Sequence, residues 1–532
     1  MTEDIQTMAT NRRTFLRFWL PILIVDITLL AMALIWFLPS EDFERIFRVV
    51  GVELTGTLGA ILLFLWFLLF SGRSLRSRGI ALVAGLLVVG LGFVFVERIE
   101  FTGDIEPIFH WRFAKKNDDI LEAHRQEKKT ADATPSSQTA IEGTFPAFRG
   151  AARDGVVSGP PLARNWESSP PQAVWRQPVG GGYASITIEN NRAYTIEQRR
   201  DKEAVVCYDA ATGRERWVAE YPALFTEAMG GPGPRATPTL YEGKVYSLGA
   251  TGVLLCLEAE SGKEVWRVNI LDENHDPNIT WGMSGSPLVY DQFVVVNPGA
   301  QKPEAEGKAV VAYDRLTGKE VWSAGKTRAG YSSPMLAKLA GKRQILVFDG
   351  EGIGGYDATS GNELWRHPWT TQEGINVAQP LALEGDRVFI TSGYGVGCAM
   401  LQLEEKEGKI AARELWRNKS LRCRFSSPVA HNGHIYGLDE GILVCVDEKT
   451  GERRWKNGRY RHGQILLSGD LIVVLGEQGE LALVKADPSS FQELGTFQAL
   501  DGKTWNYLAI AGGLAFVRNH QQMACYDLRE KK

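Results

Sequence analysis

A phrase of eleven residues that ends in tryptophan recurs along the chain, and this repetition constrains the fold more than any other feature. It reads CYDAATGRERW at 207–217, AYDRLTGKEVW at 312–322 and CVDEKTGERRW at 445–455. The closing tryptophans follow one another at spacings of 39 to 56 residues, at Trp175, Trp217, Trp266, Trp322, Trp365, Trp416 and Trp455. A repeat of this length is typical of propellers and solenoids.

One complete unit, SSPVAHNGHIYGLDEGILVCVDEKTGERRW at 426–455, contains four short β-type runs separated by Asn-Gly, Glu-Gly and Thr-Gly. Short runs joined by such turns predict an antiparallel meander of four strands. The Asp and the Thr-Gly of the phrase fit a turn between the third and fourth strands. The tryptophan would then lie on the outer strand, against the neighbouring unit. We therefore interpret the phrase as a structural joint.

The first and last copies of the unit are incomplete in complementary ways. AVWRQPV at 173–179 is a lone outer strand, whereas MACYDL at 523–528 stops before any tryptophan. A decayed copy, LVKADPSSFQELGTF, closes near Leu494 or Gly495. Eight closing positions and an N-terminal strand that completes the last unit predict an all-β, eight-bladed propeller over residues 145–532.

Three long, nearly uncharged segments precede the repeats, at 18–38, 54–70 and 79–96. Each can cross a hydrocarbon core as a helix at about 1.5 Å per residue. The alternative is a buried helix for one of them, but three in tandem with charged flanks favour three transmembrane helices. We assign residues 1–101 to a membrane anchor. Residues 102–144, which are charged and then small and polar, are expected to form a linker.

The distribution of Lys and Arg predicts the orientation of this anchor. Arg12, Arg13 and Arg17 precede the first segment, and a second arginine cluster at 73–78 separates the second segment from the third. Because basic residues favour the cytoplasmic side, the N-terminus is expected in the cytoplasm and the repeats on the other side. For a bacterial chain this places the anchor in the inner membrane and the propeller in the periplasm.

Composition excludes other classes of function. A formal net charge of -4 gives no cationic surface for nucleic acid. The six cysteines include no CxxC or Cys-Cys pair, so metal binding through thiols has no support and no metal site is predicted. Cys207, Cys256, Cys445 and Cys525 share one place in the repeat, which indicates small buried side chains.

The repeated phrases resemble the tryptophan-docking repeat of the pyrroloquinoline-quinone (PQQ) propeller superfamily. The leader FPAFRGAARDGVVSG at 145–159 and the phrases AVWRQPVGGGYAS and YSSP look like the bacterial PQQ-like repeat proteins of this group. The resemblance implies the fold alone, because this superfamily contains quinoprotein dehydrogenases and also non-enzymatic propellers such as the outer-membrane protein assembly lipoprotein. The alcohol dehydrogenases of the superfamily stack their cofactor against adjacent cysteines and hold calcium with Glu, Asn and Asp. This chain lacks the cysteine pair, and no residue can be matched to the calcium ligands.

A ligand would be expected at the axis, where the loops that lead into the first strands converge. The axial candidates for contact with a cofactor or ligand are Tyr183, Arg235, Trp281, Tyr331, Asn376, Gln379, Arg424 and Trp505. Arg235 and Arg424 could hold an anion such as a quinone carboxylate. The alternative is that the polar residues before the first strands only bind backbone groups of a narrow channel. No catalytic residue is predicted.

We therefore expect a membrane-anchored periplasmic PQQ-like propeller that acts as a scaffold for a protein partner and does not bind nucleic acid. The insertions at 270–282 and 297–309 are candidate partner-binding loops. The alternative is a membrane-bound quinoprotein dehydrogenase that oxidises alcohols or sugars with PQQ and calcium.

Overall fold

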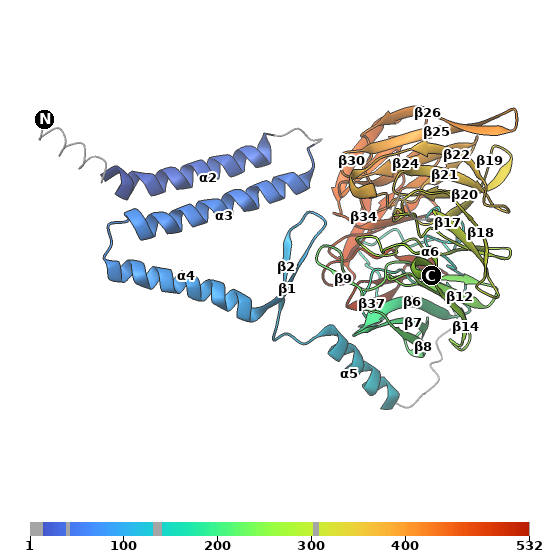
Figure 1. The fold of residues 1–532 in the computed structure, drawn as a ribbon, viewed down its shortest axis with the longest axis horizontal. Coiled ribbons are helices and arrows are strands. Elements are labelled where there is room, and N and C mark those ends of the chain that lie inside the picture. The colour runs from blue at the N-terminus through green and yellow to red at the C-terminus, as the bar shows by residue number, and fades with distance from the viewer. Residues whose placement is uncertain (1–13, 39–42, 131–140, 302–307, 531–532) are drawn as a thin grey trace, which may run out of the picture. The chain divides into compact units, whose positions relative to one another are not determined.

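The computed structural model describes residues 14–38, 43–130, 141–301 and 308–530, which divide into two compact units. One unit holds the N-terminal helices and a short hairpin, and the other is a large β domain (Figure 1).

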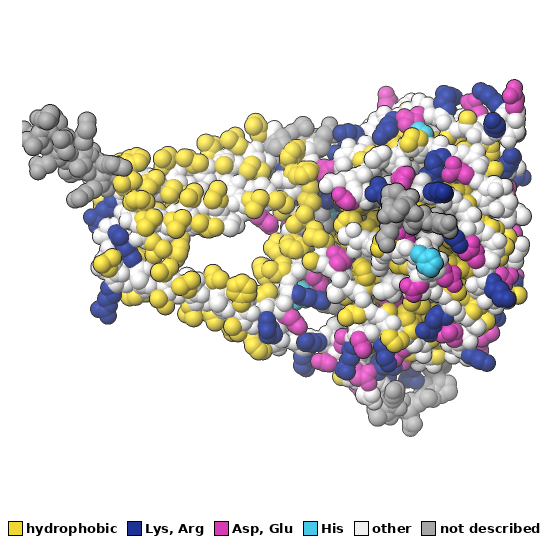
Figure 2. Space-filling view, viewed as in Figure 1, with side chains coloured by type: hydrophobic (Ala, Val, Ile, Leu, Met, Phe, Trp, Pro, Cys, Tyr) yellow, Lys and Arg dark blue, Asp and Glu magenta, His cyan; other side chains and the backbone are white. Residues whose placement is uncertain are grey.

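The N-terminal unit contains three helices that are long and apolar enough to cross a membrane, Phe15–Phe37, Arg45–Phe70 and Leu75–Phe95. The first begins with a π-helical turn (η1, Phe15–Trp19) and continues as α2 (Leu20–Phe37), and the others are α3 (Arg45–Phe70) and α4 (Leu75–Phe95). Hydrophobic side chains cover their outer surface (Figure 2). The three predicted candidate spans are thus present as helices.

The ends of these helices differ from the predicted ends. The second helix begins at Arg45, well before the predicted residue 54. Arg48 and Glu53 interrupt the apolar run from which the start was predicted, but they do not interrupt the hydrogen bonding of the helix. Glu44, at φ -60° and ψ 135°, is the extended residue that precedes this helix.

Two ordered elements occupy the region predicted as a linker. A hairpin of β1 (Val96–Phe101) and β2 (Pro107–Trp111) follows α4 directly. Helix α5 (Asn117–Thr130) belongs to the β domain. Its Asn117 donates to Val179 O at 2.7 Å, and its Arg125 binds both carboxylate oxygens of Glu215, at 3.0 and 3.1 Å. This polar segment therefore contains a helix that polar contacts fix to the propeller.

The β domain is a ring of eight blades, as predicted, each with four antiparallel strands; in the seventh blade the leader adds a fifth strand, β3 (Val156–Val157), which pairs in parallel with the first strand of the blade. The first four blades are β5 (Thr187–Glu189), β6 (Arg192–Arg199), β7 (Lys202–Asp209), β8 (Glu215–Pro222); β11 (Thr239–Tyr241), β12 (Lys244–Leu248), β13 (Val253–Glu258), β14 (Glu264–Asn269); β15 (Leu288–Tyr290), β16 (Phe293–Val296), β17 (Val310–Asp314), β18 (Glu320–Ala324); and β19 (Met335–Leu339), β20 (Lys342–Phe348), β21 (Gly352–Asp357), β22 (Glu363–Pro368). The first strands of neighbouring blades contact one another and so line the axis.

The last four blades repeat this order and close the ring. They are β23 (Leu381–Leu383), β24 (Arg387–Ser392), β25 (Gly397–Lys406), β26 (Lys409–Asn418); β27 (Val429–His431), β28 (His434–Asp439), β29 (Ile442–Asp447), β30 (Arg453–Arg459); β31 (Gln464–Ser468), β32 (Leu471–Leu475), β33 (Glu480–Lys485), β34 (Glu493–Gln498); and β35 (Ala509–Ala511), β36 (Leu514–Arg518), β37 (Gln522–Asp527) with β4 (Ala173–Pro178). Strand β4 pairs antiparallel with β37, with Trp175 opposite Cys525. The N-terminal strand therefore completes the eighth blade, as predicted.

Five of the seven repeated tryptophans bind the next blade through the indole N–H. The acceptors are carbonyls in the turns between the third and fourth strands, in the pairs Trp175–Ala210, Trp217–Ala259, Trp266–Arg315, Trp416–Glu448 and Trp455–Asp487, at 2.8 to 3.2 Å. Four of these five turns contain a glycine, and each of the four has little room for a side chain. A Cβ on Gly262, for example, would lie 2.5 Å from the Trp217 ring.

Two tryptophans depart from this pattern. Trp365 Nε1 donates to Gln344 Oε1 of its own blade at 2.5 Å. Trp322 Nε1 has no hydrogen-bond partner in the described part of the chain. The carbonyl expected to accept from Trp322, Ala358 O, instead accepts from the Tyr290 hydroxyl at 2.6 Å.

The decayed seventh copy has Gly495 at the position of the docking tryptophan. A Cβ at Gly495 would lie 2.7 Å from Cβ of Trp166, a leader residue that is 1% exposed. The Trp166 ring packs edge-on against Phe497 at 5.6 Å, and Glu167 N donates to Leu494 O at 3.2 Å. A tryptophan from outside the repeats thus fills the space that the repeat leaves empty.

Candidate functional site at the mouth of the propeller axis

One buried polar residue from each blade lies at or just before the start of the first strand. The eight residues are Ser185, Thr237, Ser286, Ser333, Gln379, Ser427, Gln464 and Tyr507, here called the axial ring. They mark the end of the propeller at which the first strands begin, and we call that end the mouth.

The axial ring is held by hydrogen bonds between neighbouring blades. A hydroxyl of one blade accepts from the backbone N–H of the preceding blade in the pairs Ser185–Thr237, Thr237–Ser286, Ser286–Ser333 and Gln379–Ser427, at 2.9 to 3.0 Å. Across the ring, the Tyr507 hydroxyl donates to Ser427 Oγ at 2.6 Å. Gln379, a predicted ligand contact, donates to Ser333 O at 2.9 Å and is 1% exposed. The side-chain nitrogen of Gln379 therefore already donates a hydrogen bond to a residue that lines the channel.

Two arginines of the leader, Arg149 and Arg153, enter the channel below this ring. The leader contacts the far ends of the first strands: Phe145 pairs with Ile188, and Pro146 O accepts from Leu240 N at 2.8 Å. Both arginines have left-handed backbone conformations, with φ 61° and 59°. The leader turn is therefore shaped so that two cationic side chains point into the axis from the face opposite the mouth.

Arg153 joins three blades through acceptors that carry no formal charge. Its guanidinium donates to Ser286 O at 3.0 Å, Pro334 O at 2.9 Å and Thr239 Oγ1 at 3.1 Å, and also to Pro287 O. Burial lowers the pKa of Arg153 to about 9. The side chain is still protonated at neutral pH, and carbonyl dipoles replace the water around the cation.

Arg149 also binds uncharged acceptors, on the opposite side of the axis and in a single blade. It donates to Ser427 O at 3.0 Å and Pro428 O at 2.5 Å, and its guanidinium lies 5.4 Å from the Tyr507 ring centre. Sequence reasoning noted the leader only as part of a resemblance and did not select these two arginines. The sequence did contain a signal for them, which was the pair of arginines in the Gly-rich turn RGAARDG before the first blade.

Aromatic and cationic side chains cluster above the axial ring, at the mouth. The Tyr183 and Trp505 rings are 5.5 Å apart, and Phe425 lies 4.9 Å from Trp505. Lys503 lies 4.3 Å from the Trp505 ring centre, and Arg235 lies 5.7 Å from that of Tyr183. Three of the predicted site residues, Tyr183, Arg235 and Trp505, are thus brought together.

The two arginines predicted to hold an anion are each paired with a carboxylate of this chain. Arg235 binds Glu227 at 3.1 Å, and Arg424 binds Glu440 at 2.6 Å. Burial lowers the pKa of Arg235, because the charged guanidinium loses its hydration. The carboxylate of Glu227 offsets part of this effect. An anionic ligand would have to displace these internal carboxylates.

The remaining candidates form a second group beside the mouth. The Trp281 ring meets the Tyr331 ring edge-on at 5.6 Å, and both are half-buried. Asn376 is fully buried and accepts from Tyr331 N at 2.8 Å through its backbone carbonyl. Its side-chain amide donates to Asp349 O at 2.7 Å. Asn376 therefore positions Tyr331 and does not reach the surface.

The insertion that contains Trp281 is an ordered structure. It begins with helix α6 (Ile270–Asn274), capped by Asn269, and Asn274 donates to Gly299 O at 2.6 Å and accepts from Lys308 N at 3.0 Å. The second insertion is thereby tied to the first, although residues 302–307 lie outside the described residues. Among the residues that are described, no three His, Cys, Asp or Glu side chains are grouped to hold a metal ion.

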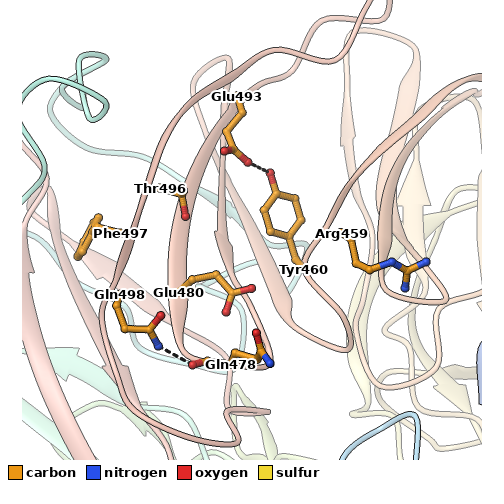
Figure 3. Close-up of a pocket in the computed structure, with 8 residues that line it drawn as sticks. All are labelled: Arg459, Tyr460, Gln478, Glu480, Glu493, Thr496, Phe497 and Gln498. Carbon is orange, nitrogen blue, oxygen red and sulfur yellow. Dashed lines mark hydrogen bonds between the residues drawn. The ribbon is translucent and has the colours of Figure 1, made fainter. Parts of the chain in front are cut away.

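A polar pocket of about 410 Å³ lies away from the axis, between the sixth and seventh blades (Figure 3). The Tyr460 hydroxyl donates to Glu493, and the Gln498 amide donates to Gln478 O at 2.6 Å. Glu480 points into the same space, and burial raises the pKa of its carboxyl group. Two hydrogen bonds thus join polar groups across this pocket.

The ring of blades, the tryptophan joints and the closing strand make this chain an eight-bladed β-propeller, and its repeats are similar to those of PQQ-like propeller proteins. The family model described as Outer membrane protein assembly factor BamB matches residues 201–457. The protein of that name from Burkholderia pseudomallei is 22% identical over 340 residues, which are 60% of this chain and 78% of the relative.

The sequence similarity to quinoprotein enzymes covers a shorter segment of the chain. The quinohemoprotein alcohol dehydrogenase ADH IIB of Pseudomonas putida is 29% identical over 120 residues, 22% of this chain and 17% of the enzyme. The crystal structure of quinohemoprotein alcohol dehydrogenase from Comamonas testosteroni aligns with 78% of this chain and 84% of its own, with a TM-score of 0.52 and 11% identity. At this identity the likeness shows the fold alone.

The residues at the mouth do not fit PQQ with calcium. The cofactor is an anion with several carboxylates, and the two arginines in reach are neutralised by Glu227 and Glu440. The six cysteines are free and buried, and burial raises the pKa of Cys423 to about 12. No catalytic step through PQQ is derived.

Proposed function

We propose that this chain is a membrane-anchored scaffold whose propeller binds a protein partner at the mouth. The observation that carries this proposal is the closed axis: Arg149 and Arg153 fill the channel from one face, and the axial ring closes it from the other. A partner must then bind on the surface of the propeller. Relatives named as outer membrane protein assembly factors support a role in binding other proteins.

The proposed contact surface combines the half-buried aromatic residues of the mouth with the ordered insertion beside them. The contact between Trp281 and Tyr331 links these two features, because Trp281 lies near the end of the insertion and Tyr331 leads into the fourth blade. Half-buried aromatic side chains supply contact area with little loss of conformational entropy on binding. Trp505, which is half-buried and packs on the buried Tyr183, adds to this surface.

We further propose that α2, α3 and α4 span the bacterial inner membrane with the N-terminus in the cytoplasm and the propeller in the periplasm. Three helices of sufficient length support an anchor, and arginines at 12–17 and 73–78 support this orientation.

Site-specific photo-crosslinking in cells tests the partner surface. A benzophenone amino acid replaces Trp281 or Tyr331 at the mouth, or Leu316, which is exposed in the opposite turn of the third blade. We expect a discrete cross-linked protein from positions 281 and 331 but not from 316. Cross-links that are absent from the mouth, or identical at all three positions, would contradict the proposal.

The dehydrogenase alternative is tested separately. PQQ and Ca²⁺ are added to the purified full chain, and absorbance and dye reduction with alcohols and aldoses are followed. Stoichiometric binding with turnover would replace the scaffold by an enzyme. We expect neither, because the arginines at the mouth are already paired.

A further inference from the structure

The hairpin β1–β2 runs from the end of α4 to the start of α3 within the N-terminal unit (Figure 1). Its base is fixed to α4: Arg112 N donates to Phe95 O at 2.7 Å, and the Arg112 guanidinium donates to Phe93 O at 3.2 Å. A cation at the last carbonyls of a helix also complements the helix dipole. The hairpin is therefore an extension of the last turn of α4.

The tip of the hairpin is fixed to the start of α3. Arg45, the first residue of α3, binds Asp104 at 3.0 Å and Glu106 at 3.6 Å. The Arg45 guanidinium also lies 5.1 Å from the ring centre of Trp36, near the end of α2. The end of α2, the start of α3 and the end of α4 lie on one membrane face if the three helices are spans. The hairpin then runs across that face.

The two faces of the hairpin differ in chemistry. Because side chains alternate along a strand, Ile99 and Phe109, which are paired across the hairpin, share a face with Trp111. The Phe109 and Trp111 rings stack at 6.2 Å, and Phe109 and Trp111 are 48% and 55% exposed. The other face carries Glu100, which binds Arg98 at 2.8 Å and His110 at 3.4 Å.

The exposed apolar face continues the apolar surface of α4. Phe93 and Phe95 end this helix with exposed rings, and Phe113, which follows β2, lies 5.6 Å from Phe95. Aromatic side chains concentrate at the boundary between acyl chains and headgroups, where an apolar ring and a polar edge are both accommodated. A surface of this kind at the end of a span matches that boundary.

We propose that β1–β2 is an interfacial element that inserts Ile99, Phe109 and Trp111 into the headgroup–acyl boundary of the bilayer and keeps the exposed Arg98, on its other face, toward water. This inference rests on the proposed membrane anchor. By lying flat on the lipid, the hairpin fixes the point at which the chain leaves the membrane. The occupant of the apolar face is lipid, because the face is continuous with the lipid-facing side chains of α4.

Nitroxide scanning of the full chain in liposomes tests this inference. Single substitutions Phe109→Cys and Trp111→Cys report the apolar face, Arg98→Cys reports the ionic face, and Leu87→Cys reports the exposed side of α4. The six native cysteines are buried, so the unsubstituted chain gives the labelling background. The measurement compares collision of each label with oxygen, which enriches in lipid, and with a water-soluble nickel chelate.

We expect labels at 87, 109 and 111 to collide mainly with oxygen and the label at 98 mainly with the chelate. Labels at 109 and 111 that behave like 98, or that are shielded from both reagents, while 87 still reports lipid, would overturn the interfacial role and leave the anchor intact. A label at 87 that reports water would instead overturn the anchor.

Discussion

The indole Nε1 of Trp217 donates a hydrogen bond to Ala259 O of the next blade at 3.0 Å, whereas Nε1 of Trp322, in the equivalent place, has no partner among the described residues. Both rings pack against the turn glycine of the following blade, Gly262 and Gly361 respectively. The chain thus contains the same joint with and without its hydrogen bond.

This pair allows the hydrogen bond to be separated from the packing. Trp217→Phe removes ring area and a hydrogen bond. Trp322→Phe removes a similar ring area but no hydrogen bond. We expect Trp217→Phe to lower the free energy of unfolding by about 1 kcal/mol more than Trp322→Phe, because a net protein hydrogen bond contributes about that much. Urea unfolding of the full chain, followed by circular dichroism, measures the difference. Equal losses would show that the indole N–H is immaterial.

The turn glycines are expected to be less replaceable than other glycines of positive φ. Gly262, at φ 71°, would place a Cβ 2.5 Å from the Trp217 ring, and Gly433, at φ 73°, has nothing within 4 Å. Gly433→Ala should cost about 1–2 kcal/mol, which is the cost of a left-handed conformation for a residue with a Cβ. Gly262→Ala should lower the unfolding midpoint further, since the indole must move. Equal midpoints for the two variants would refute a packing constraint at the joint.

Local features of this propeller were accessible from sequence, because each blade is built from contacts within about forty residues. The turn of Asp314, Thr317 and Gly318 illustrates this, since Thr317 N and Oγ1 both donate to Asp314 Oδ1 within three residues. The same repetition predicted that β4 would pair with β37.

Contacts made by unrepeated segments were not accessible in this way. Arg153 meets Pro334 across 181 residues, and Asn117 of α5 meets His520 across 403. Nothing in the leader or in the segment before it repeats, so no second copy indicates its role. The pairing of Arg424 with Glu440 joins two loops of unrelated sequence and was missed for the same reason.

Trp166 is predicted to complete the joint at the seventh blade. It is 1% exposed and packs on Phe497 beside Gly495. Trp166→Ala should destabilise the chain by about 3–5 kcal/mol, as for other large core side chains. Trp166→Phe should cost much less, because Trp166 Nε1 has no hydrogen-bond partner within the described residues. A small effect of Trp166→Ala on the unfolding midpoint would show that the leader only covers this blade.

Acid is expected to loosen the turns between the third and fourth strands. Hydrogen bonds from Thr317, Ser360 and Ser489 lower the pKa of Asp314, Asp357 and Asp487, the last to about 2. Because the folded-state pKa is below the unfolded value near 3.8, the unfolded chain binds more protons in that range. Stability from these turns is therefore full above about pH 4 and is lost as the pH falls from there toward 2.

Stability measured against pH for Asp314→Asn provides the check on this acid effect. Asparagine still accepts hydrogen bonds but does not titrate. The variant should be less stable than the parent at pH 7 and should approach it near pH 2, since the Asp314 contribution is then lost from the parent as well. A constant difference between pH 7 and pH 2 would show that the turn aspartates do not carry this pH dependence.

Replacing a channel arginine by lysine keeps the positive charge but removes the planar, forked guanidinium. Arg153→Lys leaves one ammonium group to replace a fork that reaches Thr239, Ser286 and Pro334 on three blades, so we expect a loss of about 2–4 kcal/mol in the free energy of unfolding. Arg164→Lys is the matched control, because Arg164 is exposed and its ion pair with Asp470 is worth less than about 1 kcal/mol. If the two variants lose the same stability, the fork of Arg153 does not hold the blades together, and a positive charge in the channel is sufficient.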